Sequence, residues 1–81
     1  MVPNKAVVAP DIQTALLYAH AFCLDTEEWG FYDMKGRSDN AFDRIVWLCD
    51  EHGFRDQGKE SYYHWIHRLT PNGQLLTLSI R

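Results

Sequence analysis

The sequence predicts a small α+β domain in which two helices pack on a small antiparallel sheet. Three observations lead to this prediction: helix-forming stretches at about residues 11–25 and 39–52, and a C-terminal run of strand formers divided by Asn72-Gly73. The expected order is helix, loop, helix, strand, strand, and residues 6–8 could add a short N-terminal edge strand. A chain of 81 residues, 46% apolar and 23% charged, corresponds to a single globular domain over residues 1–81.

The first helix is predicted over about residues 11–25, where Asp11 can accept hydrogen bonds from the free amides of the first turn. The stretch from 12 to 24 contains no Gly or Pro, and one apolar face has helical spacing: Ile12, Leu16, Ala19 and Cys23. A second apolar strip consists of Ala15, Tyr18 and Phe22. Because the helix is apolar nearly all round, we expect it to lie centrally or to present one side to a partner.

Residues 29–38 are predicted to form a loop that contains two glycines and three aromatic residues, Trp29, Phe31 and Tyr32. Two interpretations are open. The aromatic side chains could fold down as a lid on the core, because small cores recruit aromatic side chains for their large area. They could instead form an exposed binding loop.

The second helix is predicted over residues 39–52. One of Ser38, Asp39 and Asn40 would cap it, and Gly53 would end it in the left-handed conformation. Its apolar stripe at 3–4 spacing consists of Ala41, Phe42, Ile45, Leu48, Cys49 and His52.

A C-terminal β-hairpin is predicted from residues 62–69 and 74–80, because Asn72-Gly73 is a preferred pair for a type I′ turn. Its outer face would carry Tyr62, His64 and Arg68. The helical stripes and the inner face of the hairpin together predict the core: Leu16, Ala19, Cys23, Phe42, Ile45, Cys49, Trp65, Leu76 and Leu78.

The charge pattern argues against a nucleic-acid partner. The net charge is −3, with net −5 over residues 1–51 and net +2 over residues 52–81, and this basic end is too weak to bind phosphate by electrostatics alone. The sequence lacks the charged and apolar regions of a signal peptide, and its longest apolar run is far too short to span a membrane. We therefore expect a cytoplasmic protein with reduced cysteines.

All six His and Cys residues fall into pairs with two residues between them, a spacing that metal sites use. If the two helices packed side by side, a structural zinc site could form from His20, Cys23, Cys49 and His52. The two cysteines also lie where the helical stripes require a small apolar residue, so the prediction favours core positions and no metal or other cofactor. His64 and His67 would point to opposite faces of a strand.

Catalysis and nucleic-acid binding have weaker support. The sequence contains no nucleophile elbow and no Gly-rich phosphate loop, so no catalytic residue is assigned and an enzyme is not expected. The order helix, helix, hairpin matches a winged helix, but its recognition helix at 39–52 would carry four acidic residues and only Arg44. A hairpin that stacks bases on Tyr62, His64 and Arg68 is the other nucleic-acid alternative.

The remaining prediction is a non-catalytic protein-interaction module, of the kind found among small bacterial or phage accessory and inhibitor proteins that bind a larger protein. A homodimer through the hairpin edge or the first helix is an equally natural assembly. The predicted contact surface combines aromatic and basic side chains of the loop and the hairpin: Trp29, Phe31, Tyr32, Tyr62, His64 and Arg68.

Overall fold

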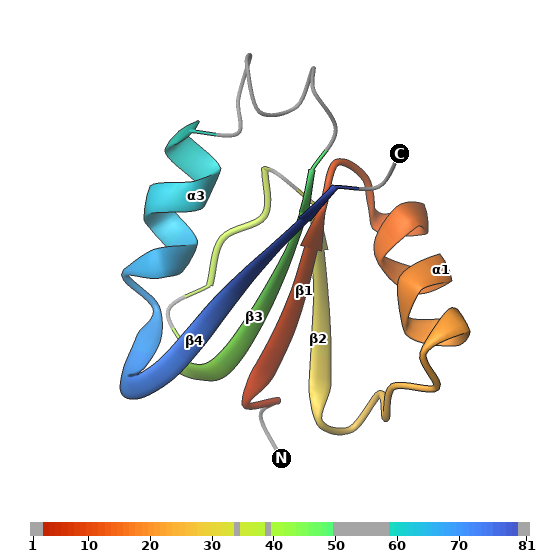
Figure 1. Cartoon of the computed structure of the whole chain (residues 1–81), viewed down its shortest axis with the longest axis horizontal. Helices are drawn as coiled ribbons and strands as arrows, with labels where there is room; N and C mark the ends of the chain where they lie inside the picture. Colours follow the sequence, from red (N-terminus) through yellow and green to blue (C-terminus); the bar gives the residue numbers. More distant parts are fainter. Residues whose placement is uncertain (1–2, 34, 39, 50–58, 80–81) are drawn as a thin grey trace.

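A four-stranded parallel sheet lies between two helices in the computed structural model, which describes residues 3–33, 35–38, 40–49 and 59–79 (Figure 1). The elements, in chain order, are β1 (Lys5–Ala9), α1 (Ile12–Ala21), β2 (Trp29–Asp33), β3 (Phe42–Cys49), α3 (Lys59–Ile66) and β4 (Leu69–Ser79). The strand order is β2-β1-β3-β4. The predicted small domain of two helices and a sheet is confirmed in this coarse form, whereas the antiparallel sheet and the predicted order of elements are wrong.

The two inner strands have contiguous apolar sequences because both of their faces are covered. Residues 6–9 of β1 are all fully buried, and residues 45–48 of β3 are at most 7% exposed. Strands that are buried on both faces have continuous apolar runs in place of alternation. The N-terminal strand is not the edge strand that the sequence suggests, because β1 pairs with β2 on one side and with β3 on the other.

Helix α1 packs on one face of the sheet, over β1 and β2. Asp11 caps it as predicted, because its side chain accepts a hydrogen bond from the backbone N–H of Thr14 at 2.8 Å. Only Ala15 and Ala19 of the helix are buried, and their small side chains let the helix approach the sheet. The cluster on this face also contains Val7, Ala9, Val46 and Leu48.

Helix α3 packs on the opposite face, where its Ser61 and Trp65 are both fully buried. Trp65 belongs to the cluster formed with Ala6, Val8, Phe42, Ile45 and Trp47. The chain between β2 and β3 crosses on the same side, because the backbone N–H of Ser38 donates to Nε2 of His64 at 3.2 Å. The connection therefore reaches β3 with a direct contact to α3.

The predicted second helix over residues 39–52 is wrong, since Phe42–Cys49 form strand β3. The apolar positions do have helical spacing, but residues 45–49 are also a continuous run of apolar residues that begins with two β-branched residues. As a strand between β1 and β4 the whole run is buried, whereas a helix would bury only the residues on one of its faces. The expected stop at Gly53 lies outside the described residues.

The expected antiparallel pairing of residues 62–69 with 74–80 is also wrong. Residues 59–66 form α3, and β4 is one strand that runs parallel to β3. Asn72-Gly73 lies within β4, where the chain bulges: Leu69 pairs with Phe42, and the next pair is Gln74 with Arg44. A Cβ on Gly73 would lie only 2.9 Å from the carbonyl oxygen of Phe42, so the sequence position requires glycine for close approach and not for a hairpin turn.

The predicted core is confirmed at Ala19, Phe42, Ile45 and Trp65, which are all at most 7% exposed. It is wrong at three positions on the α1 side of the sheet: Leu16 is 49% exposed, Leu76 is 54% exposed, and Cys23 is exposed. Leu78 is half-buried, and the side chain of Cys49 lies outside the described part of the chain. The α1 side is therefore less covered than the helical pattern predicted.

Replacing Ile45 with Ala should lower the free energy of unfolding by about 2–4 kcal/mol, because the substitution leaves a cavity between the sheet and α3. Leu17→Ala is the control, since Leu17 is 70% exposed and its loss should cost less than about 0.5 kcal/mol. Urea unfolding followed by circular dichroism measures both values. Equal losses in the two variants would contradict the assignment of the core.

Replacing Ser61 with Ala should raise the free energy of unfolding by about 1 kcal/mol. The Ser61 hydroxyl is fully buried and has no hydrogen-bond partner in the described structure. Removing it eliminates a desolvation cost, and alanine is also the better helix former. Ser61→Val is the control, because it also removes the hydroxyl but adds a methyl group that the helix–sheet contact must accommodate. A lower unfolding midpoint for Ser61→Ala would show that the hydroxyl stabilises the fold.

Candidate functional site

The aromatic residues of the predicted loop lie in strand β2, and they do not form one surface. Trp29 and Phe31 pack against the apolar cluster under α1. Tyr32 points to the other face, where its ring lies 4.7 Å from the ring of Trp65. The alternation of Trp29, Phe31 and Tyr32 around Gly30 is the strand signal in the sequence. All three side chains are half-buried, which corresponds to the core-covering interpretation more closely than to an exposed loop.

The predicted outer face of the hairpin does not exist, because its residues belong to α3 and the turn after it. Tyr62 contacts Trp47 with ring centroids 5.3 Å apart. His64 accepts the hydrogen bond from Ser38 and lies edge-on against Trp65. Arg68 is half-buried, and its carbonyl oxygen accepts a hydrogen bond from the N–H of Phe42. The six predicted contact residues are thus distributed over both faces of the sheet.

The candidate zinc ligands are not brought together in the described part of the chain. His20 and Cys23 lie at the end of α1, which runs back to the amino edge of the sheet, whereas Cys49 is the last residue of β3 at the carboxyl edge. His52 and the side chain of Cys49 lie outside the described residues. Within residues 3–33, 35–38, 40–49 and 59–79, no group of three or more His, Cys, Asp or Glu side chains could hold a metal ion.

Cys23 closes the end of α1 with the left-handed conformation, at φ 54°. The N–H of Leu24 donates to the carbonyl of Ala19, and the N–H of Cys23 donates to the carbonyl of His20. These two bonds form a Schellman motif, in which this position is usually glycine. The sequence pattern had suggested that the helix continued through Cys23. The motif instead turns the chain and leaves the thiol exposed.

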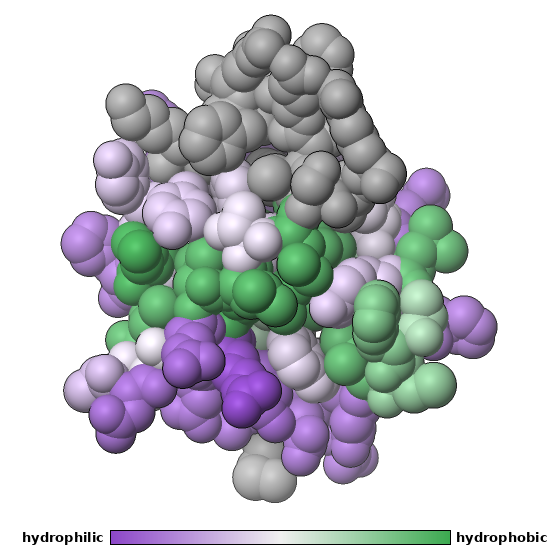
Figure 2. Space-filling view, viewed as in Figure 1, coloured by the Kyte–Doolittle hydropathy of each residue, from purple (hydrophilic) through white to green (hydrophobic). Residues whose placement is uncertain are grey.

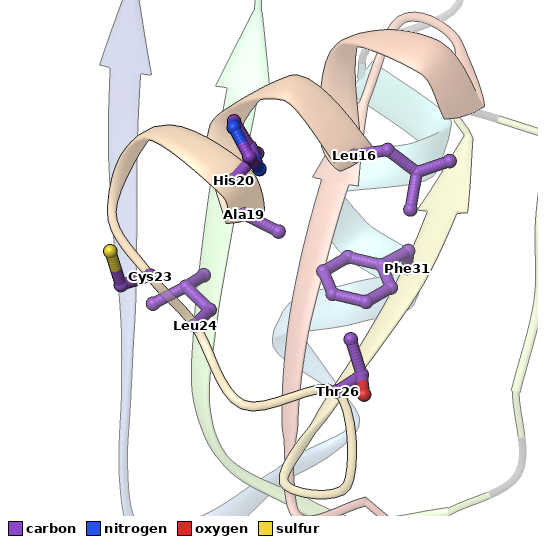
Figure 3. Close-up of a pocket in the computed structure, with 7 residues that line it drawn as sticks. All are labelled: Leu16, Ala19, His20, Cys23, Leu24, Thr26 and Phe31. Atoms are coloured by element: carbon purple, nitrogen blue, oxygen red, sulfur yellow. The ribbon is translucent and has the colours of Figure 1, made fainter.

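A shallow depression of about 320 Å³ lies between the end of α1 and β2. Its lining consists of Leu16, Ala19, His20, Cys23, Leu24, Thr26 and Phe31. Figure 3 shows Phe31 of β2 on one side of it, between Leu16 above and Thr26 below, and Cys23 and Leu24 on the opposite side. The lining contains no charged carboxylate or amine and few polar groups, whereas ligand pockets fix their ligands with several convergent polar groups. The depression therefore resembles part of an apolar contact surface.

The carboxyl edge of the sheet is where ligands bind in open parallel α/β sheets. The described carboxylates at this edge already accept hydrogen bonds from neighbouring residues. Asp11 accepts from the N–H and the hydroxyl of Thr14, and Asp33 accepts from the N–H of Lys35 at 2.9 Å. The segments that follow β3 and β4 lie outside the described residues. The described part of this edge thus shows no assembled catalytic group.

The free edge of β4 is the most unusual feature of the surface. Strand β4 pairs with β3, and no strand lies on its other side within the described ranges. Residues Gln74–Ser79, which we call the β4 edge, contain no charged residue, no Pro and no Gly. Natural proteins usually protect edge strands with charges, Pro, short length or bulges. Pro71 and the bulge protect only the first part of β4, so the β4 edge is open to pairing with another strand.

The opposite edge of the sheet differs in the expected way. Strand β2 has only five residues and ends in Asp33. At its start, Lys5 of the neighbouring strand forms an ion pair with Glu28 at 3.4 Å and lies 5.9 Å from the ring of Trp29. A short edge with charges at both ends is a poor template for strand addition. Of the two edge strands, β4 is therefore the one with a long uncharged segment.

Apolar side chains are exposed beside the β4 edge and, as a separate patch, on α1. Figure 2, which looks onto β4, shows an apolar band across the middle of this face and a further apolar patch on the side of α1. Leu76 is 54% exposed on the face that α1 leaves uncovered, and on α1 itself Leu17 is 70% and Phe22 63% exposed. Exposed apolar patches of this kind mark interaction sites. The signal in the sequence is the uncharged run at 74–79, which the Asn-Gly pattern assigns to a hairpin strand.

Comparison with known proteins found no matching family model, no similar curated protein and no similar solved structure. No helix in the described ranges is long and apolar enough to cross a membrane.

Replacing Cys23 with Gly should raise the free energy of unfolding by about 1 kcal/mol, because glycine adopts the left-handed conformation without a steric penalty. Ala21→Gly is the matched control: it lies two residues earlier within the helix and should lower stability by about 0.5–1 kcal/mol. Thermal and urea unfolding of both variants measure the difference. Destabilisation by Cys23→Gly would show that the thiol makes a contact that offsets the backbone strain.

Proposed function

We propose that this chain is a non-catalytic protein-interaction module that binds its partner by strand addition at the β4 edge. The observation that carries the proposal is a six-residue segment without charge, Pro or Gly at the edge of the sheet. In strand addition, main-chain hydrogen bonds supply affinity and alternate side chains supply specificity. The proposed contact surface thus differs from the six residues expected from the sequence.

The side chains at the β4 edge define the chemistry of the partner. Leu76 and Leu78 lie on the face of α1, and Leu75 packs against the cluster under α3. Gln74 and Thr77 are the polar residues of the segment whose side chains are described. A complementary segment is therefore extended, apolar and uncharged, and its binding should depend little on salt.

A protein partner fits this surface better than a nucleic acid does. A phosphate backbone requires basic side chains, and β4 contains none. The winged-helix skeleton also lacks its recognition helix, because residues 42–49 are a strand. A small accessory protein of the cytoplasm would use such an edge to attach to another protein chain, which is either a larger protein or a second copy of itself.

Replacing Leu76 with Lys should abolish partner binding while the melting temperature changes by only about 2 °C, because the side chain is half exposed in the free protein. When a strand is added, the lysine at position 76 would lose its water and have no opposite charge to pair with. Leu17→Lys is the matched control: it places the same charge at an even more exposed leucine on α1 and should leave binding intact. The complex is recovered from a host lysate treated with nuclease, and its affinity is then measured with the purified partner.

Hydrogen exchange of the same complex tests the mode of binding. The amides of residues 74–79 that point away from β3 should exchange slowly in the complex and rapidly in the free chain, because an added strand would accept their hydrogen bonds. Binding that Leu17→Lys abolishes and Leu76→Lys preserves would place the contact surface on α1. Unchanged exchange at 74–79 in a stable complex would also contradict strand addition.

A further inference from the structure

We propose that the partner of the β4 edge is the β4 edge of a second copy of this chain, paired antiparallel about a twofold axis through Thr77. This inference rests on the proposed function, because it identifies the strand that is added. The result is an eight-stranded sheet across two copies. Three properties of the edge favour the second copy: its symmetry, its lack of charge and the width of its apolar surroundings.

The symmetry of the edge is compatible with self-pairing. Two edges that pair antiparallel are related by a twofold axis perpendicular to the sheet, so each face of one copy continues the same face of the other. Residues that lie directly opposite one another must therefore be on the same face of the sheet. Because side chains alternate between the faces along a strand, the axis must pass through a residue and not between two residues. With the axis at Thr77, Leu76 opposes Leu78 of the second copy, and Leu78 opposes Leu76.

Among axes within residues 74–79, this register is the one that opposes leucine to leucine in two pairs. Two Leu–Leu pairs form on the face that α1 leaves open, where Leu76 is 54% exposed in the single chain. Thr77 opposes Thr77 of the second copy, and Thr–Thr pairs are favourable across strands. An axis at Leu76 would instead oppose Gln74 to Leu78, which places an amide beside an apolar side chain. The axis at Thr77 also opposes Leu75 to Ser79, but it forms two Leu–Leu pairs where the axis at Leu76 forms one, and the number of leucine pairs favours Thr77 as the centre.

The charge distribution removes the usual obstacle to self-association. Two copies with a net charge of −3 each repel one another at long range, but β4 carries no charged residue. Like charges directly opposed across a strand pair are destabilising, and none would be opposed here.

The size of the face fits a second copy better than a single bound peptide. The two longer extents of the chain are 33 and 27 Å, and both lie in the plane of Figures 1 and 2. This face is therefore several strand widths across, and an apolar band crosses its middle. A single peptide strand occupies only about 5 Å in the pairing direction. Part of the apolar band on this face would stay exposed beside such a peptide.

The first measurement is the mass of the full chain in solution. Native mass spectrometry and sedimentation should show a dimer at concentrations of about 1–100 µM, the range in which a micromolar Kd is detected. Hydrogen exchange across the same range should show protection of amides within 74–79 that increases with concentration. A chain that stays monomeric throughout overturns the inference.

The register is tested with two variants at the proposed axis, Thr77→Lys and Thr77→Glu. Thr77 is exposed, so both variants should fold. Each variant alone would place two like charges opposite one another and should raise the dimer Kd at least about tenfold. An equimolar mixture would oppose Lys to Glu and should form a mixed dimer with recovered affinity. The matched control is the pair Leu17→Lys and Leu17→Glu on α1, which should dimerise as the unmodified chain does.

The outcomes separate the two proposals. Dimers that form equally well with Thr77→Lys, Thr77→Glu and their mixture overturn the axis at Thr77. A monomeric chain that captures another protein in a manner sensitive to Leu76→Lys would overturn the second copy and retain the β4 edge as a binding site. A dimer that the Leu17 variants disrupt and the Thr77 variants preserve would place the interface on α1 and overturn both proposals.

Discussion

Coverage of the inner strands on both faces is the constraint on which the rest of the structure depends. Every residue from 6 to 9 in β1 is fully buried, and Ile45, Trp47 and Leu48 of β3 are at most 1% exposed. A parallel strand can be buried in this way only if the connections pass over the faces of the sheet, which places α1 on one side and α3 on the other. The small residues at these contacts, Ala15 and Ser61, let a chain of this size form three layers.

The same constraint explains why β4 is different. Two helices cannot cover both faces of four strands completely, and α1 packs over β1 and β2. On the α1 side, the outer strand β4 therefore keeps Leu76 exposed and its outer main-chain edge unpaired within the described ranges. A bulge and Pro71 protect the beginning of the strand, where Gly73 permits close approach to the carbonyl of Phe42. Beyond Gly73 the strand has the composition of an interior strand, and this mismatch with its edge position is the basis of the proposed function.

The proposed site consists of ordinary residues, and this is why the sequence did not reveal it. The candidate residues from the sequence are aromatic residues, His and Cys, but the aromatic side chains mostly pack in or against the two apolar clusters. The rings of Tyr32 and Phe42 pack against each other and against Trp65 of α3. His64 accepts a hydrogen bond from the backbone N–H of Ser38. The leucine and threonine side chains at residues 75–78 carry no charged, metal-binding or catalytic group that would mark a site. Their importance comes from their position at an edge, which depends on the strand order.

Local interactions determined what could be derived from the sequence alone. Asp11 caps the first helix because its carboxylate lies three residues from the amide it accepts from, and the two apolar strips of that helix include side chains that remain exposed, among them Leu16 and Phe22. The tertiary structure decided the secondary structure of residues 42–49 and 59–66. The first segment has helical spacing and is a strand, because pairing with β1 and β4 buries both of its faces. The second is rich in strand formers and is a helix, because Ser61 and Trp65, four residues apart, both pack against the sheet. In both segments contacts between residues distant in the sequence outweigh propensities of about 1 kcal/mol or less, and no local pattern contains those contacts.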